Sequence, residues 1–172
     1  MYRTITLAAA LASALGIAGA AAAGPTDPQI AHIAYTAGLI DIEAGKQALD
    51  KSQNNDVRAF AQQMIGDHTA VNDQALALVK KLNVTPEDNA TSKGLAEAAD
   101  AERKKLADLS GVAFDKAYVD NEVAYHKAVD DAVSKTLIPS AQNAELKTLL
   151  QNGLKLFEAH LAHAEQLAKQ FQ

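Results

Sequence analysis

The stretch VRAFAQQMIGDHTAVNDQALALVKKL, residues 57–82, decides the fold class of this protein. It carries an apolar residue at every third or fourth position over almost four heptads, which is the spacing of one face of an α-helix. His68 interrupts this apolar face at its centre. A helix that buries such a face needs partner helices, so the stretch predicts an all-α bundle.

Helix-forming segments rich in Ala, Leu, Lys and Glu continue on both sides, and no alternating strand pattern of useful length occurs. The predicted long helices span residues 27–52, 56–82, 112–137 and 143–171, and a shorter, highly charged helix spans residues 92–109. Prolines fall where the apolar period breaks, and Pro139 is expected to end the helix before it. We therefore expect a ferritin-like four-helix bundle, in which a long crossover between helices two and three holds the extra short helix. An up-down-up-down connection is the alternative.

The N-terminus predicts export. Arg3 precedes an apolar run over residues 5–23, which is rich in alanine and ends in small residues. A basic start, a short apolar core and an Ala-x-Ala site are typical of a secretory signal peptide. A retained membrane anchor is the alternative, but the run is only weakly apolar and no basic stop-transfer cluster follows it. We expect residues 1–23 to be a signal peptide cleaved near Ala23, and residues 24–172 to form one periplasmic domain without a membrane span.

The composition excludes several classes of site and partner. The chain has no cysteine, which excludes disulfide bonds, thiolate ligands and a cysteine nucleophile. Removal of Arg3 with the leader changes the formal net charge from −5 to −6, and the remaining basic residues form no stripe. Nucleic acid is therefore not an expected partner. The sequence identifies no protein partner either.

Five ionisable residues fall on or beside the faces that the long helices are expected to bury. They are Asp41, His68, Glu122, His126 and His160. In an antiparallel hairpin, residues that are equally far from the turn lie at the same height. Counted from the turn between the first two long helices, Asp41 is therefore level with His68. Counted in the same way from the turn between the last two long helices, the height of His160 falls between those of Glu122 and His126. These side chains are therefore expected to meet inside the bundle.

Imidazole and carboxylate groups at one level point to a metal site. Both are ligands for first-row divalent ions, and a buried carboxylate needs a cation or hydrogen bonds to offset its desolvation. We expect a single ion, with zinc as the first expectation and copper or iron as further possibilities. The alternative is a buried His–carboxylate network that only fixes the register of the helices.

The residues around these positions resemble a known bacterial family. The matching stretches are GLIDIEAG at 38–45, VRAFAQQMIGDH at 57–68, FDKAY at 114–118 together with His126, and EAHL at 158–161. They are similar to the exported, ferritin-like proteins of the family named domain of unknown function 4142. The resemblance covers about residues 30–167.

The resemblance implies a ferritin-like bundle and a set of inward residues, but no settled activity. The family's inward acid and three histidines correspond to Asp41, His68, His126 and His160. The family usually has Glu where this chain has Asp41, and it often has Met where this chain has Glu122. Both differences touch the expected site and therefore its metal preference.

Di-iron chemistry is not expected. Di-iron bundles place a Glu-x-x-His pair on each of two helices, whereas Ile65, Val123 and Phe157 stand three residues before the histidines here. An enzyme that uses the ion as a Lewis acid would need an open coordination position, and the sequence offers no separate nucleophile or general base. The leading expectation is storage, buffering or structural use of one ion. A metal-free structural or stress-response protein of the envelope is the alternative.

We predict that the exported chain begins near Gly24. Signal peptidase cleaves after the small residues that end the apolar run, and no cysteine is present there for lipid attachment. Intact-mass spectrometry of the protein recovered from the periplasm checks this prediction. Recovery of the uncleaved chain in the membrane fraction would contradict it.

Overall fold

The computed structural model describes residues 24–172, so the predicted signal peptide lies outside the described residues. The helices α2 (Asp27–Lys51), α3 (Asn55–Lys81), α5 (Gly111–Ala132) and α7 (Ala144–Ala168) are the four long ones that the sequence predicts. The predicted short helix is α4 (Ala90–Ala107). A π-helical turn (Val133–Leu137) and α6 (Ile138–Ser140) follow α5, and a 3₁₀ turn (Lys169–Phe171) follows α7. The described residues contain no strand, which confirms the all-α prediction.

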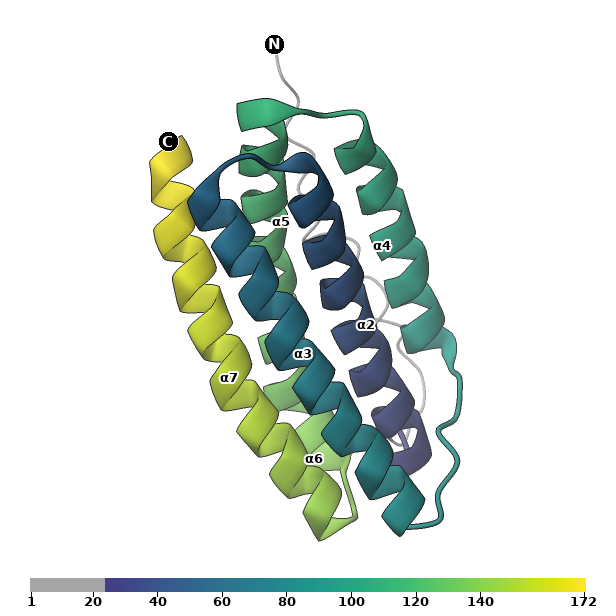
Figure 1. The fold of residues 1–172 in the computed structure, drawn as a ribbon. Helices are drawn as coiled ribbons and strands as arrows, with labels where there is room; N and C mark the ends of the chain where they lie inside the picture. Colours follow the sequence, from purple (N-terminus) through teal and green to yellow (C-terminus); the bar gives the residue numbers. More distant parts are fainter. Residues whose placement is uncertain (1–23) are drawn as a thin grey trace.

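The helices form two antiparallel hairpins joined by a long crossover (Figure 1). The first hairpin is α2 with α3, and the second is α5 with α7. Between them, α4 runs back along the outer side of α2, so that α5 begins at the same end of the bundle as α3. The chain therefore has the crossover connection and not the up-down-up-down alternative. No helix of the described part is long and apolar enough to span a membrane.

Asparagine caps fix the starts of the second helix of each hairpin. The side-chain oxygen of Asn54 accepts hydrogen bonds from the first backbone N–H groups of α3. Asn143 does the same for α7. Such caps satisfy donors that a helix start leaves without a partner. Asp27 joins the two hairpins, because its carboxylate accepts from the backbone N–H of Gln142 and of Asn143, both at 2.8 Å.

The core consists of two apolar clusters with a polar layer between them. One cluster gathers around Phe60, Phe114 and Tyr118 at the end where α3 and α5 begin. The other gathers around Ile30 and Val133 at the opposite end. The ionisable residues that the sequence analysis selected stand between them in every long helix. The polar layer is therefore held on both sides by packed apolar side chains.

The prediction that Pro139 ends the third long helix is wrong. Helical structure continues to Ser140, because the preceding turn widens into a π-helix in which the Ile138 N–H donates to the carbonyl of Val133. Proline lacks an N–H and its ring clashes with the carbonyl four residues before it in a regular α-helix. A wider turn relieves the clash, so the chain passes the proline before it bends toward α7.

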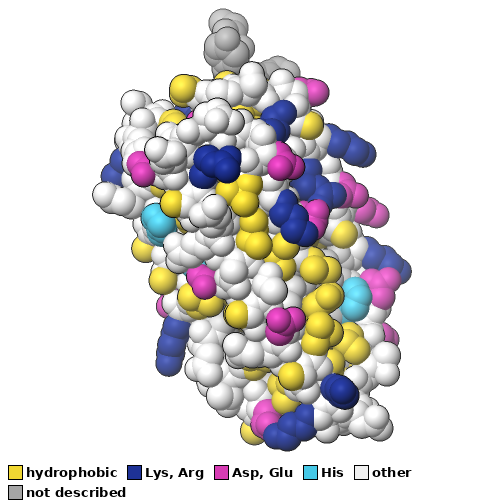
Figure 2. All heavy atoms as spheres, viewed as in Figure 1, with side chains coloured by type: hydrophobic (Ala, Val, Ile, Leu, Met, Phe, Trp, Pro, Cys, Tyr) yellow, Lys and Arg dark blue, Asp and Glu magenta, His cyan; other side chains and the backbone are white. Residues whose placement is uncertain are grey.

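The surface mixes charges of both signs. On the face that Figure 2 shows, Lys and Arg side chains alternate with Asp and Glu, and a narrow band of hydrophobic atoms crosses the face diagonally. This face carries no continuous basic area of the kind that binds a nucleic acid backbone.

We predict that Gly45→Val destabilises the protein by about 2 kcal/mol, a typical cost of overpacking. A Cβ atom at Gly45 would lie 2.9 Å from Cγ1 of Ile65 and 3.0 Å from the carbonyl oxygen of Ala61, so α2 and α3 would have to separate. Gly66→Val is the matched control, since nothing lies within 4 Å of its added Cβ. Urea unfolding should show a change below about 0.5 kcal/mol for the control. Equal midpoints for both variants would contradict the close helix contact.

Candidate metal centre

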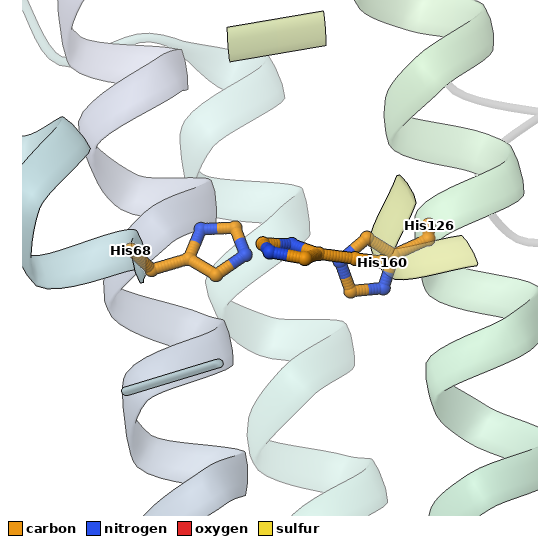
Figure 3. A group of neighbouring side chains, drawn as sticks. All are labelled: His68, His126 and His160. Atoms are coloured by element: carbon orange, nitrogen blue, oxygen red, sulfur yellow. The ribbon is translucent and has the colours of Figure 1, made fainter. Parts of the chain in front are cut away.

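The structure brings together all five residues that the sequence analysis selected. Asp41 comes from α2, His68 from α3, Glu122 and His126 from α5, and His160 from α7. Each of them is at most 2% exposed. Figure 3 shows the three imidazoles converging from three helices toward one region inside the bundle. Every long helix therefore contributes to a single buried polar group.

The donor atoms lie close enough to act on a common ion. Asp41 Oδ2 is 3.2 Å from Nε2 of His68 and 3.9 Å from Nε2 of His126. Glu122 Oε2 lies beside the same imidazole, 3.6 Å from its other nitrogen, Nδ1. In two groups of three residues, donor atoms lie within 4.8 Å of one another: His68 with His126 and His160, and Asp41 with Glu122 and His126. Since His126 belongs to both groups, they form one continuous site.

Neighbouring acceptors decide which nitrogen of two of the rings is free. His126 Nδ1 lies 3.1 Å from the backbone carbonyl of Glu122, which can only accept, so Nδ1 carries the hydrogen and Nε2 keeps its lone pair. His160 Nε2 lies 2.9 Å from Oδ2 of Asp67 and donates to it, which leaves Nδ1 with the lone pair. Both free nitrogens are buried without a hydrogen-bond partner, and so are both nitrogens of His68.

Burial sets the charge state of the rings. Desolvation lowers the pKa of His68 to about 4 and lowers the pKa of His126 and of His160 as well. All three imidazoles are therefore neutral near pH 7. Neutral imidazole is the form that binds metal ions.

The two carboxyl groups experience the opposite shift. Burial raises the pKa of Asp41, although His126 acts against the shift, and burial together with the charge of Asp41 raises the pKa of Glu122 well above its usual range. Two carboxyl groups that face each other in an apolar bundle cannot both be ionised at low cost. A divalent cation between them would lower both pKa values and favour the ionised pair.

Aromatic side chains hold the rings in place. The Phe157 ring stacks on His68, with centroids 5.0 Å apart and planes inclined by 10°. Tyr125 meets His126 edge-on at 5.9 Å and donates its hydroxyl to the carbonyl of Ala37 at 3.0 Å. These contacts restrict ring rotation, which favours a site whose donors are already aligned.

Asp67 lies outside the site and pairs with His160, and the sequence patterns did not single it out. It precedes His68 and therefore points about 100° away from the buried face of α3, toward α7. Its role depends on which helix packs against that side, and the period of a single helix carries no such information. An ionisable residue next to a buried histidine is the only signal that the sequence offers.

Comparison with known proteins identifies the family. The family profile described as domain of unknown function (DUF4142) matches residues 12–167, nearly the whole chain. The protein therefore belongs to this family, as the sequence resemblance indicates. No curated protein and no solved structure matches the chain.

We predict that, with chelator present, His68→Gln loses about 2 kcal/mol less stability than the wild type when the pH falls from 7 to 5. The pKa of His68 is about 4 in the folded protein, against 6.5 for an ordinary histidine side chain. The unfolded chain therefore binds more protons in this range, so stability is present above pH 6.5 and is lost as the pH falls toward 4. Glutamine cannot titrate, and the other buried groups are common to both proteins. Urea unfolding at the two pH values checks this, and parallel losses would contradict it.

Proposed function

We propose that this member of the DUF4142 family binds one divalent transition-metal ion inside its bundle, in the periplasm, for storage, buffering or stabilisation of its own fold. His68, His126 and His160 supply nitrogen donors, and Asp41 supplies an oxygen donor. Glu122 is the fifth candidate ligand. The proposed compartment follows from the signal-peptide pattern of residues 1–23.

The observation that carries this proposal is the convergence of buried ring nitrogens that have lone pairs and no partner. Nε2 of His126 and Nδ1 of His160 are in this state. Neither nitrogen of His68 has a hydrogen-bond partner, and one of the two carries the lone pair of the neutral ring. The great majority of buried polar atoms in proteins are hydrogen-bonded, and each one left without a partner lowers the free energy of unfolding by about 1–3 kcal/mol. Several such atoms from three helices in one place are accounted for by a ligand that accepts their lone pairs.

The spacing supports one ion. Ligands bonded at about 2 Å to a tetrahedral ion lie roughly 3.3 Å apart, so donors within 4.8 Å need to close by at most about 1.5 Å. His126 belongs to both groups of donors but has a single free nitrogen, because its other nitrogen donates to the backbone. Two ions would have to compete for that nitrogen, whereas one ion can use both groups.

The donor chemistry favours zinc, with copper(II) and iron(II) as further candidates. Three imidazoles with one carboxylate suit a tetrahedral zinc site, and a second carboxylate adds a hard donor of the kind that iron(II) accepts. Met64 stands one turn before His68, but it is completely buried in the apolar cluster around Phe60 and Tyr118. We therefore do not assign it as a soft ligand for copper.

We predict that the metal ion stabilises the wild type and that the histidine variants do not respond. At a free metal concentration 100 times the dissociation constant, the gain is about 2.7 kcal/mol, which raises the thermal midpoint by roughly 5–10 °C. His68→Ala and His160→Ala should each abolish this shift, because each removes one of the nitrogen donors. Differential scanning calorimetry with chelator, zinc, copper(II) or iron(II) measures it.

His32→Ala is the control for this experiment. His32 lies on α2 and belongs to neither group of donors, so its variant should keep the full shift. A wild type whose midpoint responds to none of the three ions would overturn the proposal. The five residues would then be a network that only fixes helix register, and His68→Ala would destabilise the protein equally with and without metal.

A further inference from the structure

One charged residue connects the buried site with solvent at the seam between α3 and α7. The side chain of Asp67 is 36% exposed, whereas its partner His160 is completely buried. Among the described residues, Asp67 is the only charged side chain outside the site that pairs with a member of the site. Its carboxylate stands at the outer edge of a group that otherwise lies inside the bundle.

Neighbouring side chains hold Asp67 at this position. Its Oδ2 accepts from Nε2 of His160 at 2.9 Å and from the side-chain amide of Gln63 at 3.4 Å. The amide oxygen of Gln63 faces Nδ1 of His163 at 3.1 Å. Gln63 and His163 are both exposed, so polar side chains lead from the surface to His160. The α3–α7 face is the one turned toward the viewer in Figure 1 and in Figure 2.

Apolar side chains cover the site on several other sides. Phe157 covers the face of His68. The hydrogen bond from the Tyr125 hydroxyl to the carbonyl of Ala37 holds the Tyr125 ring between α5 and α2. The two apolar clusters close the site along the bundle axis. A hydrated divalent cation would lose most of its solvation along any of those paths, whereas Asp67 offers a compensating charge.

We infer that Asp67 is the port through which a divalent cation reaches the site, and that it also orients His160 for binding. The inference rests on the proposed function and adds the route by which the ion reaches the site. The carboxylate attracts the ion to the seam, and the hydrogen bond that it accepts from Nε2–H of His160 keeps Nδ1 of that ring directed into the site. A carboxylate bonded to the outer N–H of a ligating imidazole fixes the ring and strengthens it as a donor. Asp67 is therefore a positioning residue with a second role in association.

Stopped-flow absorbance with cobalt(II) tests this inference, because tetrahedral cobalt(II) absorbs in the visible range and reports binding directly. Asp67→Asn keeps the shape and a hydrogen-bond acceptor but removes the charge. Its association rate constant should fall roughly tenfold at low ionic strength, and the salt dependence of that rate should weaken. Asp67→Glu keeps the charge but displaces the oxygen, so association should stay within about twofold of the wild type while dissociation into chelator accelerates about 10-fold or more.

Asp73→Asn is the matched control, because it removes the same charge from an exposed position on α3 that faces away from the seam. It should associate at the wild-type rate. Equal association rates for Asp67→Asn, Asp73→Asn and the wild type would overturn the port while leaving the metal site intact. Absence of cobalt and zinc binding by the wild type would overturn the proposed function itself. If Asp67→Asn does not fold, Asp67→Glu decides the question. Because this variant keeps the charge, a loss in its association rate as large as its gain in dissociation rate would contradict a role for charge.

Discussion

The structure depends on one constraint, which is the burial of a layer of ionisable side chains across the middle of a helical bundle. Asp41, His68, Glu122, His126 and His160 lie where a bundle of this size would otherwise place leucine or valine. Desolvation of two carboxyl groups and three imidazoles opposes folding, and only close pairing with one another or with a cation offsets it. The layer therefore tolerates little freedom in the relative height of the four helices. A shift by one residue would turn one of these groups toward an apolar cluster.

Several features outside the layer fix the relative heights of the four helices. The asparagine caps fix where α3 and α7 begin, and Asp27 joins the start of the first hairpin to the start of α7. Gly45 lets the backbones of α2 and α3 approach closely on the Asp41 side. Packed apolar clusters above and below resist sliding, because interiors at crystal-like density transmit small displacements to their neighbours. The bundle thus presents the donors of the polar layer in nearly fixed positions.

The chemistry of the layer follows from which atoms are already used. The backbone carbonyl of Glu122 and the carboxylate of Asp67 each accept a hydrogen bond from one ring N–H, and this directs the free nitrogens of His126 and His160 inward. Burial keeps all three rings neutral by lowering each pKa, and it raises the pKa of both carboxyl groups. The result is a group of neutral nitrogen donors beside carboxyl groups that lack a counter-charge. The shorter acid at position 41 and the carboxylate at position 122 are the points at which this chain differs from the usual pattern that the family resemblance suggests.

The sequence by itself determined the helical class, the five helices and the inward residues, because a 3.6-residue period assigns each side chain to one face of its own helix. Short hairpin turns also let it match heights within each pair, which is why the contact between Asp41 and His68 was predictable. Only the tertiary structure decided how the two hairpins rotate against each other, and this rotation brings Asp67 of α3 to His160 of α7. It also decided that the chain passes Pro139 through a π-turn, and which nitrogen of His126 and of His160 is free. Those outcomes depend on side-chain packing and hydrogen bonds between helices. The apolar period of one helix does not specify which residues of another helix pack against it.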